Sequence, residues 1–367
     1  MSKPRRRKQK KQVKAELKLR QFASTELSDQ LAAQHSAADL PRFMVDTVAG
    51  AYAPADAHLM IEGFGAAAAR PVTLRANTLK ATAEDIAAAL GAAGIAHNPV
   101  AWYPDAFILP EAQVSDLWDL DIYRDGKIYL QSLSSMMPPL VLGAQEGEDI
   151  LDMCAAPGGK TTQIAALTQG QAHLTACEMS IPRAEKLEAN LHRQGAKNVP
   201  VMRIDARELD EFFRFDRILL DAPCTGTGTV ISGNEKSLRG LTEQLLSKCA
   251  RSQRALLDHA MGALKPGGTL VYSTCSILPQ ENEDALQEAL DKHMDCELIP
   301  LDGTPSESEA RRAQDAGEEP HIECNALTEA IAAGHVSAIT NGLPGTLTIP
   351  PSRDFEGFYI ALIRKRS

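Results

Sequence analysis

Beyond Glu148 the chain alternates between short apolar segments and longer amphipathic stretches, and this alternation restricts the fold more than any other feature. The apolar segments predict strands at residues 150–154, 174–178, 199–205, 216–221 and 269–274. The amphipathic stretches predict helices at residues 161–168, 182–194 and 242–264. Strands that alternate with helices form a parallel sheet covered on both faces. The expected fold class is therefore α/β, with a doubly wound, Rossmann-like domain.

Three further segments complete this expected domain. Pro266-Gly267-Gly268 is expected to end the third helix and to start the last of the five strands. Residues 357–365 predict a closing strand. Residues 301–320 are polar and are expected to form a loose insertion.

The part of the chain before Glu148 has a different pattern. Residues 26–65 are rich in Ala and Leu at helical spacing, residues 70–80 alternate like a strand, and residues 82–90 follow an N-cap threonine. A short strand is expected at residues 128–131. These elements predict a small α+β domain of RNA-recognition-like size. The expected organisation is a basic disordered tail (1–22), a helical and α+β RNA-binding module (23–145) and the Rossmann-like domain (146–367).

Charge is distributed unevenly along the chain. The whole chain has a net charge of −10, with 38 Lys and Arg against 48 Asp and Glu. Ten of those basic residues but only Glu16 among the acids lie in residues 1–20. Such a tail fits an electrostatic contact with a phosphate backbone, although a solvated tail without a partner remains the alternative.

The cysteines and the apolar runs exclude several classes of protein. None of the seven cysteines forms a CxxC pair, so neither a zinc cluster nor another metal site is expected. No signal peptide and no apolar run long enough to span a bilayer is visible. We therefore expect a cytoplasmic protein without a membrane partner, and a monomer.

A glycine-containing turn predicts a nucleoside pocket. The strand at residues 150–154 leads directly into Pro157-Gly158-Gly159, and ligands of open α/β sheets bind beyond the carboxyl ends of strands. Glu178 follows Gly158 by 20 residues, the spacing of an acid that binds ribose hydroxyls. Asp205 ends the third strand, where it could meet an adenine amino group. S-adenosylmethionine (SAM) is the favoured ligand. An NTPase P-loop would need glycine at Cys154.

Two cysteines and one acid predict the chemistry. Asp221 and Cys224 lie in Asp-Ala-Pro-Cys after one strand, and Cys275 lies in Ser-Thr-Cys-Ser after another. Carbon 5 of cytosine is a poor nucleophile until a thiolate adds to carbon 6. A carboxyl group then stabilises the developing charge, and a base removes the carbon 5 proton. Asp221, Cys224 and Cys275 could supply these three functions, and the motifs alone favour Cys224 as the nucleophile.

Four motifs together resemble the RsmB and Sun-type family of RNA cytosine-C5 methyltransferases. They are Tyr129-Leu130-Gln131 with Ser134-Ser135-Met136, LDMCAAPGGKTTQIA from Leu151, LLDAPCTGTG from Leu219 and VYSTCSILPQENE from Val271. The similarity covers roughly residues 70–285, and residues 357–365 resemble the closing strand of the family. The resemblance implies a class I methyltransferase domain that uses SAM.

The resemblance also implies roles for single residues. It makes Cys275 the nucleophile and Cys224 the group that assists release of the methylated base, whereas DNA cytosine methyltransferases attack with the Pro-Cys cysteine. Lys160 and Asp221 are expected to contact the target cytosine. Arg183 is expected to brace the cofactor acids. The residues implied in SAM binding are Cys154, Ala155, Ala156, Pro157, Gly158, Gly159, Lys160, Glu178, Asp205 and Asp221.

The expected function is methyl transfer from SAM to carbon 5 of a cytidine in rRNA or tRNA through a cysteine adduct at carbon 6. A target base must be unstacked to reach such a site. The candidate contacts to the RNA backbone are Arg70, Arg75, Lys80, Lys236, Arg239, Lys248, Arg251 and Arg254. The alternatives are a non-catalytic RNA-binding assembly factor, an RNA methyltransferase acting on another atom, and a DNA cytosine-C5 enzyme.

Overall fold

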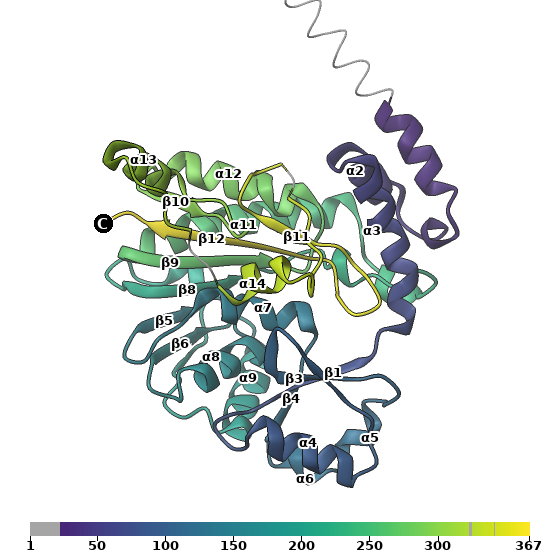
Figure 1. Cartoon of the computed structure of the whole chain (residues 1–367), viewed down its shortest axis with the longest axis vertical. Helices are drawn as coiled ribbons and strands as arrows, with labels where there is room; N and C mark the ends of the chain where they lie inside the picture. The colour runs from purple at the N-terminus through teal and green to yellow at the C-terminus, as the bar shows by residue number, and fades with distance from the viewer. Residues whose placement is uncertain (1–22, 323–324, 341) are drawn as a thin grey trace, which may run out of the picture.

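The computed structural model describes residues 23–322, 325–340 and 342–367 and contains two sheets (Figure 1). The basic tail expected at residues 1–22 lies outside the described residues. The smaller sheet is formed by strands between residues 72 and 130, and the larger one by strands between residues 149 and 365. The boundary expected between residues 145 and 146 falls between the two sets of strands and stays a prediction.

The larger sheet confirms the Rossmann-like α/β class. Its strand order is β10-β12-β9-β8-β5-β6-β7, and β11 pairs with β12 outside this path. Strands β5 to β9 run parallel, whereas β12 is antiparallel to both β9 and β10. The strands are β5 Asp149–Asp152, β6 His173–Cys177, β7 Val201–Met202, β8 Phe215–Asp221, β9 Leu264–Thr274, β10 Cys296–Ile299, β11 Leu347–Ile349 and β12 Phe358–Lys365.

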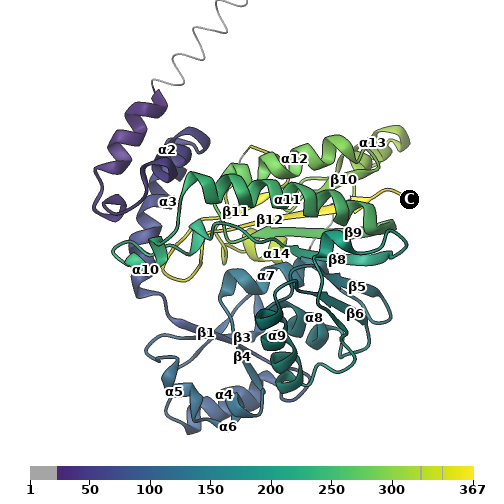
Figure 2. The ribbon, with the colours of Figure 1, turned by 180° about the vertical axis from the view of Figure 1, so that it is seen from behind.

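Helices cover both faces of this sheet, because side chains on each strand point alternately to opposite sides. On β5, Ile150 packs in one hydrophobic cluster and Leu151 in another. The first cluster includes residues of α7 Leu133–Leu142, α8 Gly159–Leu167, α9 Ile181–Gln194 and α14 Ala326–Ala332. The second includes residues of α11 Glu243–Ala263 and α12 Glu283–Lys292, which face the viewer in Figure 2.

The smaller sheet confirms the expected α+β domain. Its order is β2-β3-β1-β4, all antiparallel. The strands are β1 Val72–Ala76, β2 Asn98–Val100, β3 Tyr103–Leu109 and β4 Ile128–Leu130. Helix α4 Ala83–Ala92 begins after Thr82, whose side chain forms a capping box with Asp85. Its buried Ile86 and Leu90 pack in the same hydrophobic cluster as Leu74 of β1.

The N-terminal helices pack on the larger domain rather than on the smaller sheet. Helices α2 Arg42–Ala51 and α3 Pro54–Ala66 share a hydrophobic cluster with residues that follow β8 and β9, including Val230 and Ile277. The Tyr52 hydroxyl donates a hydrogen bond of 2.7 Å to the Ile277 carbonyl. These helices therefore support the loops that leave the carboxyl ends of the two central strands.

The remaining elements are short. They are η1 His35–Ala37, η2 Ala67–Ala69, α5 Ser115–Trp118, α6 Asp121–Arg124, η3 Ala206–Glu208, η4 Thr227–Thr229, α10 Glu235–Leu238, η5 Pro279–Glu281 and α13 Glu307–Ala316.

Two expectations are wrong in detail. Strand β9 begins at Leu264, before Pro266-Gly267-Gly268, because Leu264 pairs with Phe215 and the glycine segment then forms an irregularity before Thr269 pairs with Arg217. The polar segment 301–320 is not loose throughout, because Ser306 caps α13 through the Glu309 N–H. Strand pairing in the first case and helix capping in the second outweigh the local sequence pattern.

A buried arginine joins the two domains. Arg75 on β1 is 0% exposed, and its Nη2 donates to the Gly159 carbonyl (3.0 Å) and to Thr162 Oγ1 (2.7 Å) on α8. Its Nε donates to Gln131 Oε1 at 2.9 Å, and its guanidinium lies 5.3 Å from the centre of the Tyr129 ring. The prediction that Arg75 contacts RNA phosphates is therefore wrong.

Candidate active site

The turn after β5 requires glycine. Gly158 has φ +106°, a conformation that other residues rarely adopt, and a Cβ there would lie 2.9 Å from Leu187 Cδ1 of α9. Gly159 begins α8, and a Cβ there would lie 3.1 Å from Tyr129 Cε1. The turn is thus pressed between α9 and the small domain, and it leaves its ligand side open.

Glu178 follows β6 and faces this turn. It is 4% exposed, and its Oε1 accepts a hydrogen bond of 2.9 Å from the Ser180 N–H. Arg183 Nη1 lies 3.3 Å from Glu178 Oε2, while Arg183 Nη2 donates to the Ala156 carbonyl at 2.8 Å. Arg183 therefore joins the acid to the glycine turn, the bracing role that the resemblance implied for it.

Asp205 follows β7, the strand next to β6, at the same edge of the sheet. Its carboxylate accepts from Arg207 Nε at 2.9 Å and from the Arg207 N–H at 3.0 Å. The hydrogen bonds from Arg207 hold the pKa of Asp205 below its usual range, so the group is a carboxylate at neutral pH. The sequence pattern did not predict a role for Arg207, because its contact with Asp205 depends on the conformation of the loop after β7.

A pocket lies between these acids. Glu178 and Asp205 supply its acidic groups, their partners Arg183 and Arg207 also line it, and Ile204, Pro223 and Leu256 supply apolar walls. Two separated carboxylates and flat apolar walls fit a nucleoside, because hydroxyl and amino donors meet the acids and a base stacks on the walls. The residues present therefore fit the adenosyl part of SAM.

A second pocket, of about 480 Å³, shares one wall residue with the first. Its wall contains Lys160, Asp221 and Cys275 together with the turn residues Cys154, Ala155, Ala156, Pro157 and Gly159. Cys154 lines both pockets, so the two cavities meet at this residue. The arrangement brings a nucleoside-sized site next to a cavity that contains a thiol, an amine and a carboxylate.

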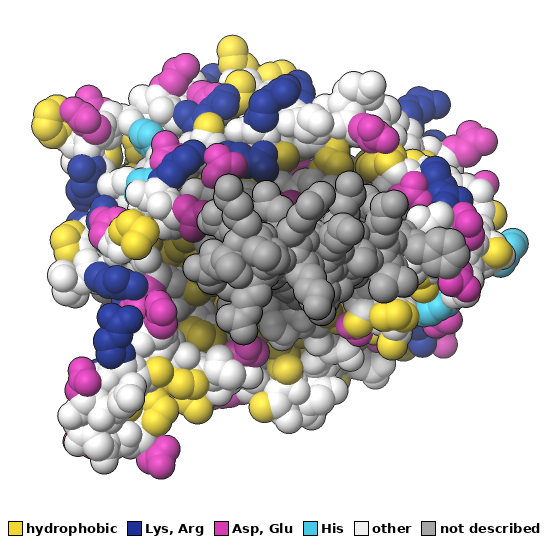
Figure 3. Space-filling model, turned by 90° about the horizontal axis from the view of Figure 1, so that it is seen from above, with side chains coloured by type: hydrophobic (Ala, Val, Ile, Leu, Met, Phe, Trp, Pro, Cys, Tyr) yellow, Lys and Arg dark blue, Asp and Glu magenta, His cyan; other side chains and the backbone are white. Residues whose placement is uncertain are grey.

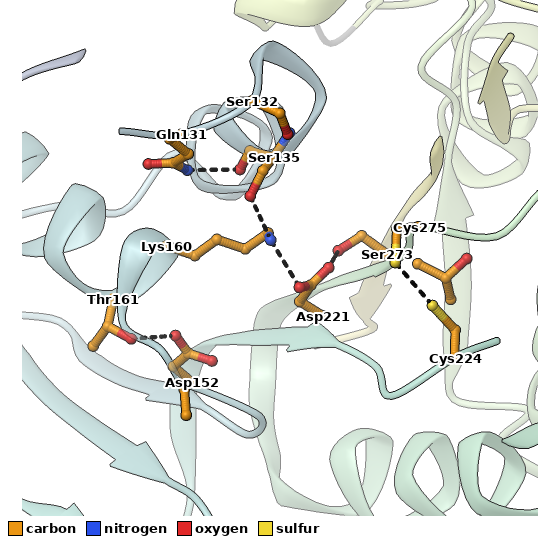
Figure 4. A network of polar contacts seen from close by, with 12 residues as sticks. Gln131, Ser132, Ser135, Asp152, Lys160, Thr161, Asp221, Cys224, Ser273 and Cys275 are labelled. Atoms are coloured by element: carbon orange, nitrogen blue, oxygen red, sulfur yellow. Dashed lines mark hydrogen bonds and ion pairs between the residues drawn. The ribbon is translucent and has the colours of Figure 1, made fainter. Parts of the chain in front are cut away.

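Lys160 and Asp221 form the polar centre of the second pocket (Figure 4). Lys160 Nζ lies 2.7 Å from Asp221 Oδ2 and donates to Ser135 Oγ at 2.8 Å. The Ser273 hydroxyl donates to Asp221 Oδ1 at 2.8 Å. Burial alone would lower the pKa of Lys160, but the charge and hydrogen bond of Asp221 outweigh it and raise that pKa. Lys160 is therefore cationic at neutral pH.

The two predicted cysteines lie side by side. Cys224 Sγ and Cys275 Sγ are 3.1 Å apart, although the residues are 51 positions apart in the chain (Figure 4). Both residues are half-buried. The hydrogen bond to Cys275 and burial raise the pKa of Cys224 well above its ordinary value. Of the two sulfurs, only that of Cys275 belongs to the lining of the second pocket.

Two polar residues at the site have no role in the sequence-based expectations. Asp152 at the end of β5 is 1% exposed and accepts from Thr161 Oγ1 at 2.7 Å; burial raises its pKa to about 6. Glu281 in η5 accepts hydrogen bonds from the residues that follow both cysteines. Both lie within motifs quoted for the family resemblance, but only the folded chain shows what they contact.

The other cations expected to contact RNA differ in their surroundings. Arg70 donates to the carbonyls of Ser352 and Phe355, and Lys80 donates to those of Asp125 and Arg193. Arg254 pairs with Glu288 at 2.6 Å. Lys80 is exposed, as are Lys236, Arg239, Lys248 and Arg251, and contact between these residues and RNA stays a prediction. Figure 3 shows basic and acidic side chains intermingled over the face seen from above.

No described helix is long and apolar enough to cross a membrane. Within the described ranges, no group of three or more His, Cys, Asp or Glu side chains is arranged to hold a metal ion.

The chain is similar to relatives of known name and structure. The chain is 40% identical over 236 residues to ribosomal RNA small subunit methyltransferase F of Shewanella loihica, covering 62% of this chain and 48% of that protein. It is 34% identical over 343 residues to the protein of the same name from Cronobacter sakazakii, covering 91% and 65%. The chain thus spans about half the length of the first curated relatives it matches.

A solved structure extends the similarity to three dimensions. It is described as a methyltransferase homolog protein from Pyrococcus horikoshii. The TM-score is 0.68 at 31% identity, over 89% of this chain and 96% of that one.

Family models match both domains. Residues 40–115 match the ferredoxin-like domain of RsmF/B-like methyltransferases, which agrees with the small antiparallel sheet. Residues 139–364 match the model of 16S rRNA methyltransferase RsmB/F, which is more than half of the chain. This is a family of SAM-dependent methyltransferases, so the cofactor expected from the glycine turn and its acids is confirmed. The chain belongs to the RsmB/F methyltransferase family.

Proposed function

We propose that this chain transfers a methyl group from SAM to carbon 5 of a cytidine in small-subunit ribosomal RNA, through a cysteine adduct at carbon 6. One observation carries the proposal: Cys275, whose Sγ lies 3.1 Å from Cys224 Sγ, lines the same cavity as the Lys160–Asp221 pair, and Cys154 belongs to the walls of both this cavity and the nucleoside pocket. Methyltransferases that act on amino groups need no such thiol. The names of the Shewanella and Cronobacter relatives support ribosomal RNA as the substrate.

Each group at the site has a separate part in the proposed reaction. SAM supplies an electrophilic methyl group when it is bound by Glu178, Asp205 and the glycine turn. The Cys275 thiolate forms a bond to carbon 6, and the electron pair of the 5,6 double bond makes carbon 5 nucleophilic. Lys160 and Asp221 face the polar edge of the ring and stabilise its charge. Once carbon 5 is methylated, its proton leaves to a base, the carbon 6–sulfur bond breaks, and Cys275 departs as a thiolate. Cys224 assists this release.

Bisulfite sequencing tests the proposal, because a cytosine methylated at carbon 5 resists deamination. We expect one cytidine of small-subunit rRNA to be protected in the parent strain, unprotected after deletion of the gene, and protected again when the gene is restored. Restoration by a Cys275→Ala gene is expected to fail. If deletion changes no cytidine in rRNA, ribosomal RNA is not the substrate.

The alternatives give different results in the same experiment. A loss of protection in tRNA would move the substrate to that class of RNA. A non-catalytic assembly factor would leave methylation unchanged and would function equally well with Cys275→Ala. Three further expectations stay predictions: the cytoplasmic location, the monomeric state, and the division at residues 22/23 and 145/146. Size-exclusion chromatography with light scattering measures the oligomeric state.

A further inference from the structure

The segment after Cys275 contains an acid that the proposed reaction does not use. Glu281 ends η5 and is 0% exposed. No ion pair to it occurs among the residues that the structure describes. A buried carboxylate without a cation is costly unless hydrogen bonds satisfy it. The position of Glu281 therefore suggests that its negative charge serves a purpose.

Hydrogen bonds to Glu281 come from both cysteine loops. Its Oε1 accepts from the Thr225 N–H at 2.8 Å and from Gln253 Nε2 at 3.2 Å. Its Oε2 accepts from the hydroxyls of Thr225 and Ser276. Thr225 directly follows Cys224, and Ser276 directly follows Cys275. One carboxylate thus joins the neighbours of the two sulfurs and fixes their separation.

The charges on the two sides of the sulfur pair are opposite. Lys160 lies in the cavity lined by Cys275 and interacts with it electrostatically. The hydrogen bond with Cys275, burial and the charge of Cys275 raise the pKa of Cys224 most, and the charge of Glu281 adds to them. A nearby cation favours a thiolate, and a nearby anion favours a thiol. The charge of Glu281 therefore favours the thiol form of Cys224, whereas Lys160, paired with Asp221, lies in the cavity lined by Cys275.

Asp221 partly offsets the charge of Lys160, because its Oδ2 lies 2.7 Å from Lys160 Nζ. Tyr272 interacts with Cys224 and Glu281 from within β9, and Cys249 interacts with Glu281 from α11. Neither Tyr272 nor Cys249 is cationic. Glu281 is the acid that acts on Cys224 most directly.

We propose that Glu281 is a positioning residue that assigns the two sulfurs their roles. It holds the cysteine loops together and keeps the proton on Cys224, so that Cys275 is the sulfur that ionises and attacks. The inference rests on the proposed function and deepens it, because it names what distinguishes two thiols that are 3.1 Å apart.

Thiol reactivity in the full-length protein without RNA tests the inference. Iodoacetamide alkylates thiolates, and peptide mass spectrometry reports Cys224 and Cys275 separately over a series of pH values. In the unmodified protein we expect Cys275 to react faster than Cys224 near neutral pH. Faster reaction of Cys224 would overturn the inference without any variant being made.

Glu281→Gln isolates the charge. The amide oxygen can still accept from the Thr225 N–H and Gln253, while its NH2 group can donate to the two hydroxyls, which rotate. We expect alkylation of Cys224 near neutral pH to rise about tenfold, the change in thiolate fraction for one pKa unit. Thr225→Ser keeps both hydrogen bonds and is the matched control. An unchanged Cys224 rate in Glu281→Gln, or an equal rise in Thr225→Ser, would overturn the inference.

Methylation measurements separate this inference from the proposed function. With small-subunit rRNA transcripts we expect Glu281→Gln to lower kcat about tenfold or more and to leave the KM for SAM unchanged, because the nucleoside pocket contains neither Glu281 nor its partners. If the unmodified protein methylates no cytidine, the proposed function fails whatever the thiols do. If the unmodified protein methylates a cytidine and Glu281→Gln retains full kcat, only the role proposed for Glu281 is refuted.

Discussion

The nucleoside pocket and the thiol site lie next to each other but are built differently. In the pocket, Glu178 and Asp205 each pair with an arginine whose side chain is about half exposed. At the thiol site, Glu281 is fully buried and is satisfied by neutral donors. An ion pair with one solvent-exposed partner tolerates a change in that partner better than a fully buried network does. Substitutions in the pocket should therefore affect affinity, and substitutions at the thiol site should affect chemistry.

The strongest test of this comparison is Cys275→Ala. Loss of the attacking sulfur removes the only route that makes carbon 5 nucleophilic, so we expect methyl transfer to fall at least ~1000-fold. SAM binding, measured by calorimetry, should remain within about twofold because Cys275 does not line the nucleoside pocket. Weakened SAM binding would show that the two regions are not independent.

Cys224→Ala is expected to have a smaller and different effect. Attack at carbon 6 still occurs, but release slows, so we expect turnover to fall about 100-fold and a covalent protein–RNA adduct to accumulate. A band of reduced mobility on a denaturing gel reports the adduct. An adduct with Cys275→Ala and none with Cys224→Ala would reverse the two roles.

Glu178→Ala probes the pocket side of the comparison. Losing a buried carboxylate that meets two hydroxyls costs about 1.5–3 kcal/mol, so the Kd for SAM should rise about 10- to 100-fold. Turnover at saturating SAM should change little. Asp205→Ala is the companion variant on the adenine side, and a large loss of kcat in either would contradict the separation.

The smallest expected effect comes from Tyr52→Phe, which keeps the ring and removes the hydrogen bond to the Ile277 carbonyl. We expect the free energy of unfolding to fall by about 1 kcal/mol, measured by urea denaturation. Because this bond supports the loop after Cys275 from outside, kcat should fall slightly and the KM for SAM should stay constant. An increase in that KM would extend the influence of the N-terminal helices to the pocket.

The sequence predicted those features that depend on local pattern. Strand ends locate Glu178, Asp221 and Cys275 at one edge of the sheet, because parallel strands all end there. The spacing from Gly158 predicted that Glu178 binds ribose hydroxyls; the structure places Glu178 in the pocket, and its contact with a ribose stays a prediction.

Other features depend on contacts between distant segments, and the sequence did not reveal them. Arg75 alternates on a strand like an exposed cation, yet α8 covers it. The sequence does not distinguish Glu281 from the other acid in its motif, because its hydrogen bond with Thr225 exists only in the folded chain. The N-terminal helices show a helical pattern, but nothing in that pattern says which domain they pack against.

The buried guanidinium of Arg75 has a mechanical consequence. It spans from the small sheet to the first turn of the helix that carries Lys160, and Asn77 adds a hydrogen bond of 2.6 Å to the Gln194 carbonyl at the end of α9. Separating these surfaces would expose an arginine that has exchanged water for carbonyl and hydroxyl partners. These contacts therefore oppose hinge motion of the small domain relative to the Rossmann-like domain. If the small domain binds RNA, as predicted, the distance between its RNA-binding surface and Cys275 is already set in the protein without RNA.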